Sequence, residues 1–404
     1  MSSWKDEELG AIVFIGSAKT GSSMDALAAV GRLGYTAILM TDRKAFSRRQ
    51  LEGVQLIYMK SLEENSIRKQ IVQLLQSGHD IKAIISFIDP YVSMAAKLSN
   101  EFCGSGISSE ALQLMEDKMM ARIALRNNEA TCEFEISSPG KRSTIMYPFI
   151  LKDPVSNGSK DVYYIEDEEG YEIAVKKLTN RLLGKQLLAE EFIEGTQYVI
   201  EVVVVETIPI IAAVVQQEIT KEYTFIVTAY DVVLQMDEED YRNLWKTVTA
   251  ILQDIGLHHG ACHLEMRLSQ DGWKLVELNP RISGGAMNRM IEEAFGINLV
   301  QETIKLYLGD EPDLIRRKQQ SVHTSYITIN STGYLLDIDG IEEAALCPGV
   351  VDVHVKPSIG ATMMPPLSMG HRYGYVMAVG ESSEVARERA EHAVRLIKFY
   401  IEPF

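Results

Sequence analysis

The chain has 404 residues, of which 46% are hydrophobic and 24% are charged, values typical of a globular protein with two or more domains. Its 40 basic and 56 acidic side chains give a net charge of −16, which argues against a general binder of nucleic acid or anionic membranes, because phosphate groups would repel it. Its four cysteines lie far apart, which argues against a disulfide framework or a structural zinc site.

The sequence begins with acidic residues rather than the basic and apolar segments of a signal peptide. Its most apolar stretches, 202–205 and 208–215, are too short to span a bilayer. We therefore expect a cytoplasmic protein with no membrane partner.

Strand and helix patterns alternate over the first 110 residues, which predicts an open parallel α/β domain. The predicted elements are a buried strand at 11–15, a helix at 24–33, a strand at 36–40, a helix at 62–76 and a strand at 81–87. The turn between the first strand and helix holds Gly16 and Gly21 but matches no dinucleotide or P-loop motif. It is either a turn that needs glycine for its backbone or a cradle for an anion at a helix N-terminus.

Shorter elements are predicted along the middle of the chain. They are a helix at 112–126 carrying Lys118 and Arg122, a strand at 148–152 ending on Lys152, a polar turn at 153–160, strands at 161–165 and 198–205, and a helix at 241–255. A hairpin follows at 263–268 and 273–278, then helices at 287–295 and 384–399, with short strands between these two helices. Lys118 and Lys152, taken singly, are better explained as solvated surface lysines.

The hairpin carries the strongest chemical pattern. Glu265 and Glu277 are almost equidistant from its turn, so they should lie opposite each other on one face, where two carboxylates repel unless a cation lies between them. A hard divalent ion satisfies both, and Asn279 adds a neutral oxygen. Arg281 follows, placed to meet phosphate oxygens bidentately. A surface hairpin with solvated acids is the alternative.

The segment from Glu265 to Val276-Glu-Leu-Asn-Pro-Arg-Ile-Ser-Gly-Gly285 resembles the metal and phosphate hairpin of ATP-grasp carboxylate–amine ligases. The ordered set of motifs agrees with this resemblance from the first strand to about residue 310. Within this family, the chain is most similar to bacterial L-amino acid ligases, in the Asn-Pro-Arg-x-x-Gly-Gly loop, the overall length and residues 360–380. Biotin carboxylase is disfavoured, because its arginine is followed by Gln-Val-Glu-His rather than by Ile-Ser-Gly-Gly.

The resemblance implies a role for each site residue. Glu265, Glu277 and Asn279 would hold Mg²⁺, with Mn²⁺ as the alternative ion, and Arg281 and Lys152 would be catalytic. ATP would be bound by Lys118, Lys152, Ser159, Glu190, Glu191, Phe192, Ile193 and Gln197, and substrate by His263, Arg281, Ser283, Gly284 and Gly285. Two positions depart from the family pattern: Asp161 stands where glycine is common in the phosphate loop, and Gln197 where a glutamate often meets the ribose.

The implied fold is α/β, an ATP-grasp fold with four parts: an N-terminal α/β domain at 1–110, a small lobe with the phosphate loop at 111–190, a large lobe with the metal hairpin at 191–310, and a C-terminal α+β subdomain at 311–404. The implied reaction is ATP-dependent joining of two L-amino acids through an acyl phosphate, with amino acids as the small-molecule partners. The resemblance allows a homodimer but leaves the oligomeric state open. A ligase of another pathway, such as purine synthesis, and a silent ATP-binding regulator remain alternatives.

Overall fold

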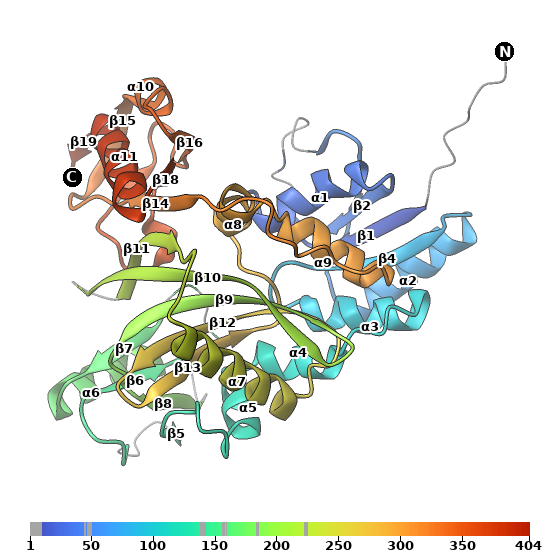
Figure 1. The fold of residues 1–404 in the computed structure, drawn as a ribbon, viewed down its shortest axis with the longest axis horizontal. Helices are drawn as coiled ribbons and strands as arrows, with labels where there is room; N and C mark the ends of the chain where they lie inside the picture. Colours follow the sequence, from blue (N-terminus) through green and yellow to red (C-terminus); the bar gives the residue numbers. More distant parts are fainter. Residues whose placement is uncertain are drawn as a thin grey trace.

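The computed structural model describes residues 10–43, 46, 51–137, 143–155, 158, 160–182, 186–221 and 225–404. These residues form four sheets with helices packed on them (Figure 1). No helix among them is long and apolar enough to cross a bilayer. Sheets and helices are mixed throughout the described residues, which agrees with the α/β class predicted from the sequence.

The N-terminal domain is an open sheet of four parallel strands in the order β3-β2-β1-β4. Its strands are β1 (Ala11–Ile15), β2 (Thr36–Thr41), β3 (Val54–Tyr58) and β4 (Ile81–Ile85), and its helices are α1 (Ser22–Arg32), α2 (Glu64–Gln76) and α3 (Val92–Cys103). The continuous apolar run of β1 is fully buried, as expected for a strand covered on both faces. The five predicted elements are present here, and the structure adds β3 and α3, which the sequence pattern did not single out.

The predicted helix at 112–126 is wrong in one respect, because two helices occupy this segment: α4 (Ser109–Glu116) and α5 (Lys118–Ala124). Asp117 has an extended backbone between them, and its carboxylate accepts hydrogen bonds from the backbone N–H groups of Met119 and Met120. An aspartate at this position starts a new helix and thereby interrupts the earlier one.

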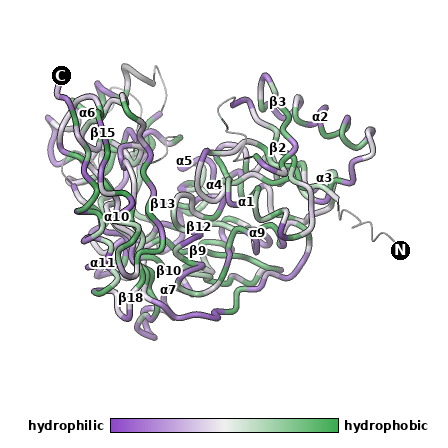
Figure 2. Tube along the Cα trace, turned by 90° about the horizontal axis from the view of Figure 1, so that it is seen from above, coloured by the Kyte–Doolittle hydropathy of each residue, from purple (hydrophilic) through white to green (hydrophobic). Residues whose placement is uncertain are grey.

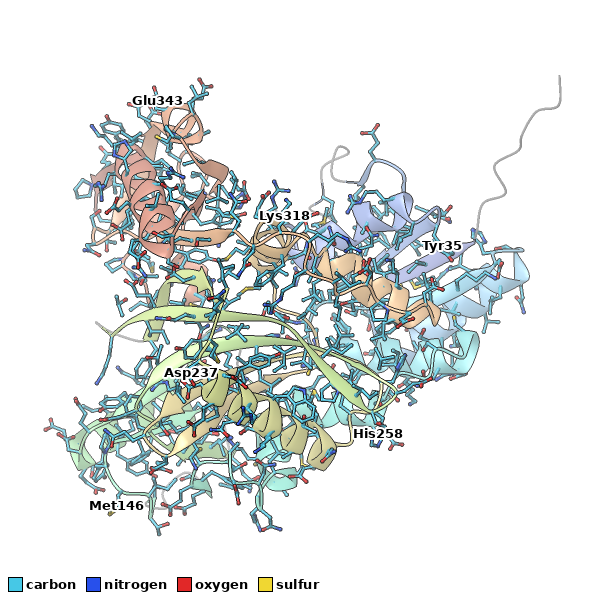
Figure 3. The ribbon with its side chains drawn as sticks, in the orientation of Figure 1. Tyr35, Met146, Asp237, His258, Lys318 and Glu343 are labelled. Atoms are coloured by element: carbon cyan, nitrogen blue, oxygen red, sulfur yellow. The ribbon has the colours of Figure 1, made fainter. Side chains whose placement is uncertain are left out.

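The small lobe is an antiparallel sheet of four strands in the order β5-β8-β6-β7. Its elements are β5 (Phe134–Ser137), β6 (Phe149–Lys152), β7 (Val162–Ile165), α6 (Glu168–Leu182) and β8 (Leu187–Glu191). A separate cluster of apolar side chains joins the sheet to α6. Met146, at the edge of this lobe in Figure 3, has 82% of its surface exposed.

The central sheet has eight antiparallel strands in the order β13-β12-β9-β10-β11-β14-β18-β16. They are β9 (Thr196–Val205), β10 (Ile208–Lys221), β11 (Phe225–Val232), β12 (Gly260–Ser269), β13 (Gly272–Asn279), β14 (Ser321–Ile327), β16 (Val350–Val355) and β18 (Gly374–Gly380). Hydrophobic residues run along its inner strands β9 and β12 (Figure 2). Strands from both sides of residue 310 therefore share one sheet, while the four-part division itself stays a prediction.

Helices α7 (Glu238–Ile255), α8 (Met287–Phe295) and α9 (Leu299–Leu308) connect this sheet to its surroundings. Helix α9 packs against α1 and β4, as Figure 1 shows, so buried side chains of the N-terminal domain and the central sheet form one continuous core. The C-terminal region adds β15 (Gly333–Asp339), α10 (Ile341–Ala345), β17 (Thr362–Met363), the 3₁₀ turn η2 (Met369–His371), α11 (Ser383–Leu396) and β19 (Lys398–Pro403).

The predicted terminal helix at 384–399 is too long, because α11 ends at Leu396. The chain then turns into β19, which pairs antiparallel with β15. The apolar side chains of Phe399 and Ile401 are packed in this small sheet, so sheet pairing replaces the last helical turn.

Candidate active site

A cavity of about 380 Å³ lies between the small lobe and the central sheet, within the size range of small-molecule sites. Its lining includes six cationic side chains, from Lys118, Arg122, Lys152, Arg267, Arg281 and Arg372, against four carboxylates, from Glu190, Glu191, Glu265 and Glu277. An excess of positive side chains on a chain of net charge −16 favours a polyanionic ligand in this cavity.

Glu265 and Glu277 face each other across the hairpin, as predicted. They are direct partners in the antiparallel register of β12 and β13, and both line the cavity, so their side chains lie on one face of the sheet. Lys118 Nζ lies 3.3 Å from Glu277 Oε1, and Gln197 Nε2 donates to Glu265 Oε2 at 3.0 Å. Asn279, 9% exposed, ends the same strand at the cavity wall.

The two carboxylates differ in how readily they ionise. Burial, and then the charge of Glu277, raise the pKa of Glu265, while Lys118 and Lys152 outweigh burial and lower that of Glu277. Two close carboxylates with one amide oxygen beside them are the donors that Mg²⁺ prefers. The residues present therefore fit the metal that the sequence predicts.

Lys152 and Arg122 hold the buried carboxylate of Glu190 between them. Arg122 Nε donates to Glu190 Oε1 at 2.6 Å, and Lys152 forms an ion pair with the other oxygen. Arg122 Nη2 also donates to the carbonyls of Leu275 and Val276 at 2.9 Å each. One arginine thus ties α5, the small-lobe strand β8 and the hairpin strand β13 together.

We expect this cluster to give the protein a distinct acid sensitivity. Burial raises the pKa of Glu190, but Arg122 and Lys152 outweigh it and lower the pKa from 4.5 to about 2. The depressed pKa stabilises the fold by about 3 kcal/mol above pH 4.5, and this contribution disappears as the pH falls through 2. Urea unfolding between pH 2 and 7 gives the free energy of unfolding as a function of pH. In Glu190→Gln this free energy should fall less between pH 4.5 and 2 than in the wild type, and an equal fall in both proteins would contradict the assignment.

The segment from Glu190 to Ile193 leads into a cluster of aromatic rings. The Phe192 and Phe225 rings stack with centroids 5.9 Å apart, and the Arg267 guanidinium lies 5.0 Å from the Phe192 centroid. Arg267 also donates to the Ile193 carbonyl and, at 2.9 Å, to Gln197 Oε1. The two phenylalanines form a flat apolar wall of the cavity that suits an aromatic base.

Arg281 meets a carboxylate of the N-terminal domain. Its Nε and Nη2 donate to Asp89 Oδ2 at 3.1 and 2.7 Å, so the fork that the sequence assigns to phosphate is held by Asp89 in this structure. His263 Nδ1 lies 2.7 Å from the Arg281 carbonyl. Burial and the Arg281 charge lower the pKa of His263 to about 4, so the imidazole is neutral at pH 7 and Nδ1–H donates to that carbonyl.

The loop from Ser283 to Gly285 is fixed from two sides. Glu201, fully buried in β9, accepts the Ser283 N–H at 3.1 Å, and Ser22 Oγ donates to the Ser283 carbonyl at 2.6 Å. Gly21 has a φ of 77°, and a Cβ there would lie 2.7 Å from Gly285 N. The glycine turn of the N-terminal domain therefore packs directly on the Gly284-Gly285 loop. Glycine is needed at position 21 because its φ is positive and because a Cβ there would meet the Gly285 backbone.

Replacing Gly21 by alanine should destabilise the protein more than replacing Gly53. The two have nearly the same φ, 77° and 75°, but the space around Gly53 is open. Gly53→Ala should thus lower the free energy of unfolding by about 1–2 kcal/mol, because alanine disfavours a left-handed backbone. Gly21→Ala should lower it by about 1–3 kcal/mol more, because the new Cβ clashes with Gly285. Unfolding midpoints of both variants measure the difference, and equal shifts would show that the two loops do not touch.

Two segments of the chain match known protein families. Residues 145–289, which include the segment from Glu190 to Ile193, the hairpin of Glu265 and Glu277 and the Gly-Gly loop, match the ATP-grasp domain. Residues 325–402 match the L-amino acid ligase C-terminal domain 2. The chain thus carries an ATP-grasp domain, followed by a region similar to the C-terminal domain of L-amino acid ligases.

Individual relatives of the chain are distant. An uncharacterized protein of Sinorhizobium fredii is 27% identical over 82% of the chain and 70% of its own length. Human carnosine synthase 1 is 22% identical over 65% of the chain, and the match spans only 35% of that longer protein. The crystal structure of an L-amino acid ligase from Bacillus licheniformis superimposes with a TM-score of 0.84 at 19% identity, covering 98% of the chain and all of that structure.

The cavity gathers the residues that the sequence singled out. Lining it are Lys118, Lys152, Glu190, Glu191, Phe192, Ile193, Gln197, His263, Glu265, Glu277, Asn279, Arg281, Ser283, Gly284 and Gly285. Ser159 lies outside the described residues. Gln197 is bonded to Glu265 and Arg267 rather than standing alone, and Asp161 adopts a φ of 57°, which explains why glycine is common at its position.

Sequence reasoning missed several residues that shape the site: Asp89, Glu201, Arg267, Tyr326 and Arg372. Asp89 lies two residues beyond the predicted strand at 81–87, and Glu201 is an acidic residue inside the apolar run of β9. A buried acid in an apolar strand is a recognisable signal. For Tyr326 and Arg372, no local pattern marks a role in the site.

Proposed function

We propose that this ATP-grasp ligase joins two L-amino acids into a dipeptide at the expense of ATP. The observation that carries the proposal is the match of residues 325–402 to an L-amino acid ligase domain, since this region supplies Tyr326 and Arg372 to the cavity. The similarity to the Bacillus licheniformis ligase over nearly the whole chain supports the same reading.

The proposed reaction has two steps. A carboxylate oxygen of one amino acid attacks the γ-phosphorus of ATP, and the bond to the β-phosphate oxygen breaks, giving an acyl phosphate and ADP. The amine of the second amino acid then attacks the acyl carbon, the C–O bond to phosphate breaks, and the amine proton is released. Mg²⁺, when bound, would neutralise charge on the transferred phosphate.

The side chains of the cavity contribute position and charge rather than a nucleophile. Glu265, Glu277 and Asn279 would hold the metal, and Lys118 and Lys152 would contact phosphate oxygens. The stacked Phe192 and Phe225 offer a surface for adenine. Arg281 would stabilise the acyl centre once substrate draws its guanidinium from Asp89.

The test is ADP release with Mg²⁺ and ATP against single L-amino acids and all their pairs, with mass spectrometry of the products. Release that requires two amino acids, together with a dipeptide mass, is the expected result. A preparation without amino acids gives the background rate. Absence of any dipeptide, despite ATP binding, would sink the proposal and leave a ligase of another carboxylate and amine, or a silent ATP-binding protein.

A further inference from the structure

A row of polar side chains crosses the central sheet along the cavity. Arg267, Gln197, Gln217 and Tyr230 are direct partners across β12, β9, β10 and β11. Direct partners in antiparallel strands point to the same face, and all four line the cavity. The row begins beside the metal pair, where Gln197 donates to Glu265, and leads away from it toward β14.

Tyr326 and Arg372 lie at the far end of this row. The Tyr326 ring contacts Tyr230 edge-on at 5.7 Å, and the Arg372 guanidinium lies 3.8 Å from the Tyr326 ring centroid. Arg372 follows the 3₁₀ turn η2, whose Met369 N–H donates to the carbonyl of Gly158 at 3.1 Å. The C-terminal region thus reaches Gly158 and sets an arginine over the Tyr326 ring at the cavity wall.

The charge of Arg372 is not taken up by the protein. Lys118, Lys152 and Arg281 each form an ion pair with a carboxylate, whereas among the described residues no carboxylate lies within 4 Å of Arg372. The guanidinium donates to the Val227 carbonyl, at 3.4 Å, and to the Tyr230 side chain, but its Nε is buried without any hydrogen-bond partner. A buried guanidinium N–H without a partner is costly, so a ligand is the natural acceptor.

A second orphaned atom lies in the same row. Gln217 is 5% exposed, and its Oε1 is buried without a hydrogen-bond donor. This end of the cavity therefore presents a charged donor and a neutral acceptor, both unsatisfied. An amino acid carries the complementary groups, an anionic carboxylate and an amine.

The proposed reaction leaves one carboxylate intact. The amino acid that is phosphorylated loses its carboxylate charge, whereas the amino acid that attacks with its amine keeps a free carboxylate into the product. We propose that Arg372 binds the carboxylate of this amine-donating amino acid and so selects a free amino acid as the second substrate. This inference rests on the proposed function.

The experiment compares a free amino acid with its carboxamide as the amine-donating substrate. The wild type should prefer the free acid in kcat/KM, and Arg372→Gln should lower that preference about 10- to 100-fold by raising KM for the acid alone. The KM for ATP should not change. Arg395→Gln, an exposed arginine of the same region at 66% side-chain exposure, is the matched control and should behave as the wild type.

Arg372→Lys is a second variant for the case that Arg372→Gln does not fold, because lysine keeps the positive charge but lacks the planar guanidinium. We expect it to raise KM for the free acid about tenfold and to leave KM for the carboxamide unchanged. An unaltered acid preference in dipeptide-forming variants would overturn the inference, as would a variant whose KM for ATP rises instead, because Arg372 would then contact phosphate. A wild type that makes no dipeptide would refute the proposed function and the inference with it.

Discussion

Replacing Glu277 by glutamine is expected to abolish ADP formation while leaving the protein folded. The substitution keeps the size of the side chain but removes one of the two charges that face each other across the hairpin. A metal site that loses a carboxylate ligand loses several kcal/mol of transition-state stabilisation, so the rate should fall about 10³-fold or more. The rate of ADP release at saturating ATP measures the effect.

Calorimetric titration of Mg²⁺ into the same variant separates loss of the metal from loss of the fold. Glu277→Gln should bind Mg²⁺ more weakly than the wild type does. Its unfolding midpoint should change little, because the Glu277 side chain is 25% exposed at the cavity. Glu342→Gln, on the surface of α10, is a matched control that should leave both quantities unchanged. Normal turnover by Glu277→Gln would show that the metal lies elsewhere.

The largest effect on stability is expected from Arg122→Ala. Its guanidinium is almost completely buried, pairs with Glu190 and donates to two carbonyls of β13. Removing one partner of a buried ion pair leaves an uncompensated charge and costs about 3–5 kcal/mol. Lys152 still contacts Glu190, so we expect a value near the lower end.

Urea unfolding of Arg122→Ala can be compared with Arg126→Ala, from the turn that follows the same helix. Arg126 is exposed and lies 5.7 Å from the Phe134 ring, so its loss should cost less than about 1 kcal/mol. The small lobe should also become more sensitive to proteolysis in Arg122→Ala, because the link from α5 to β8 and β13 is cut. Equal midpoints for the two variants would contradict the role of Arg122 as a clamp.

The metal hairpin could be predicted from sequence because its geometry is local. An Asp-Gly turn sets the register, the period of two sets the face, and Glu265 and Glu277 then have to meet. The same holds for the parallel α/β domain, whose alternating apolar strands and helices carry their own pattern. The break at Asp117 was also local, but its capping signal competes with a continuous helical period.

The sequence by itself thus determined the fold class, the ATP-grasp motifs and the facing position of Glu265 and Glu277. Only the tertiary structure decided that Asp89 holds Arg281, that Gly21 touches the Gly-Gly loop, and that Arg372 completes the cavity. The residues that meet in these three places are 192, 261 and 145 positions apart in the sequence. Turn chemistry and periodicity act over a few residues, whereas such contacts depend on how whole elements pack to bury their apolar faces.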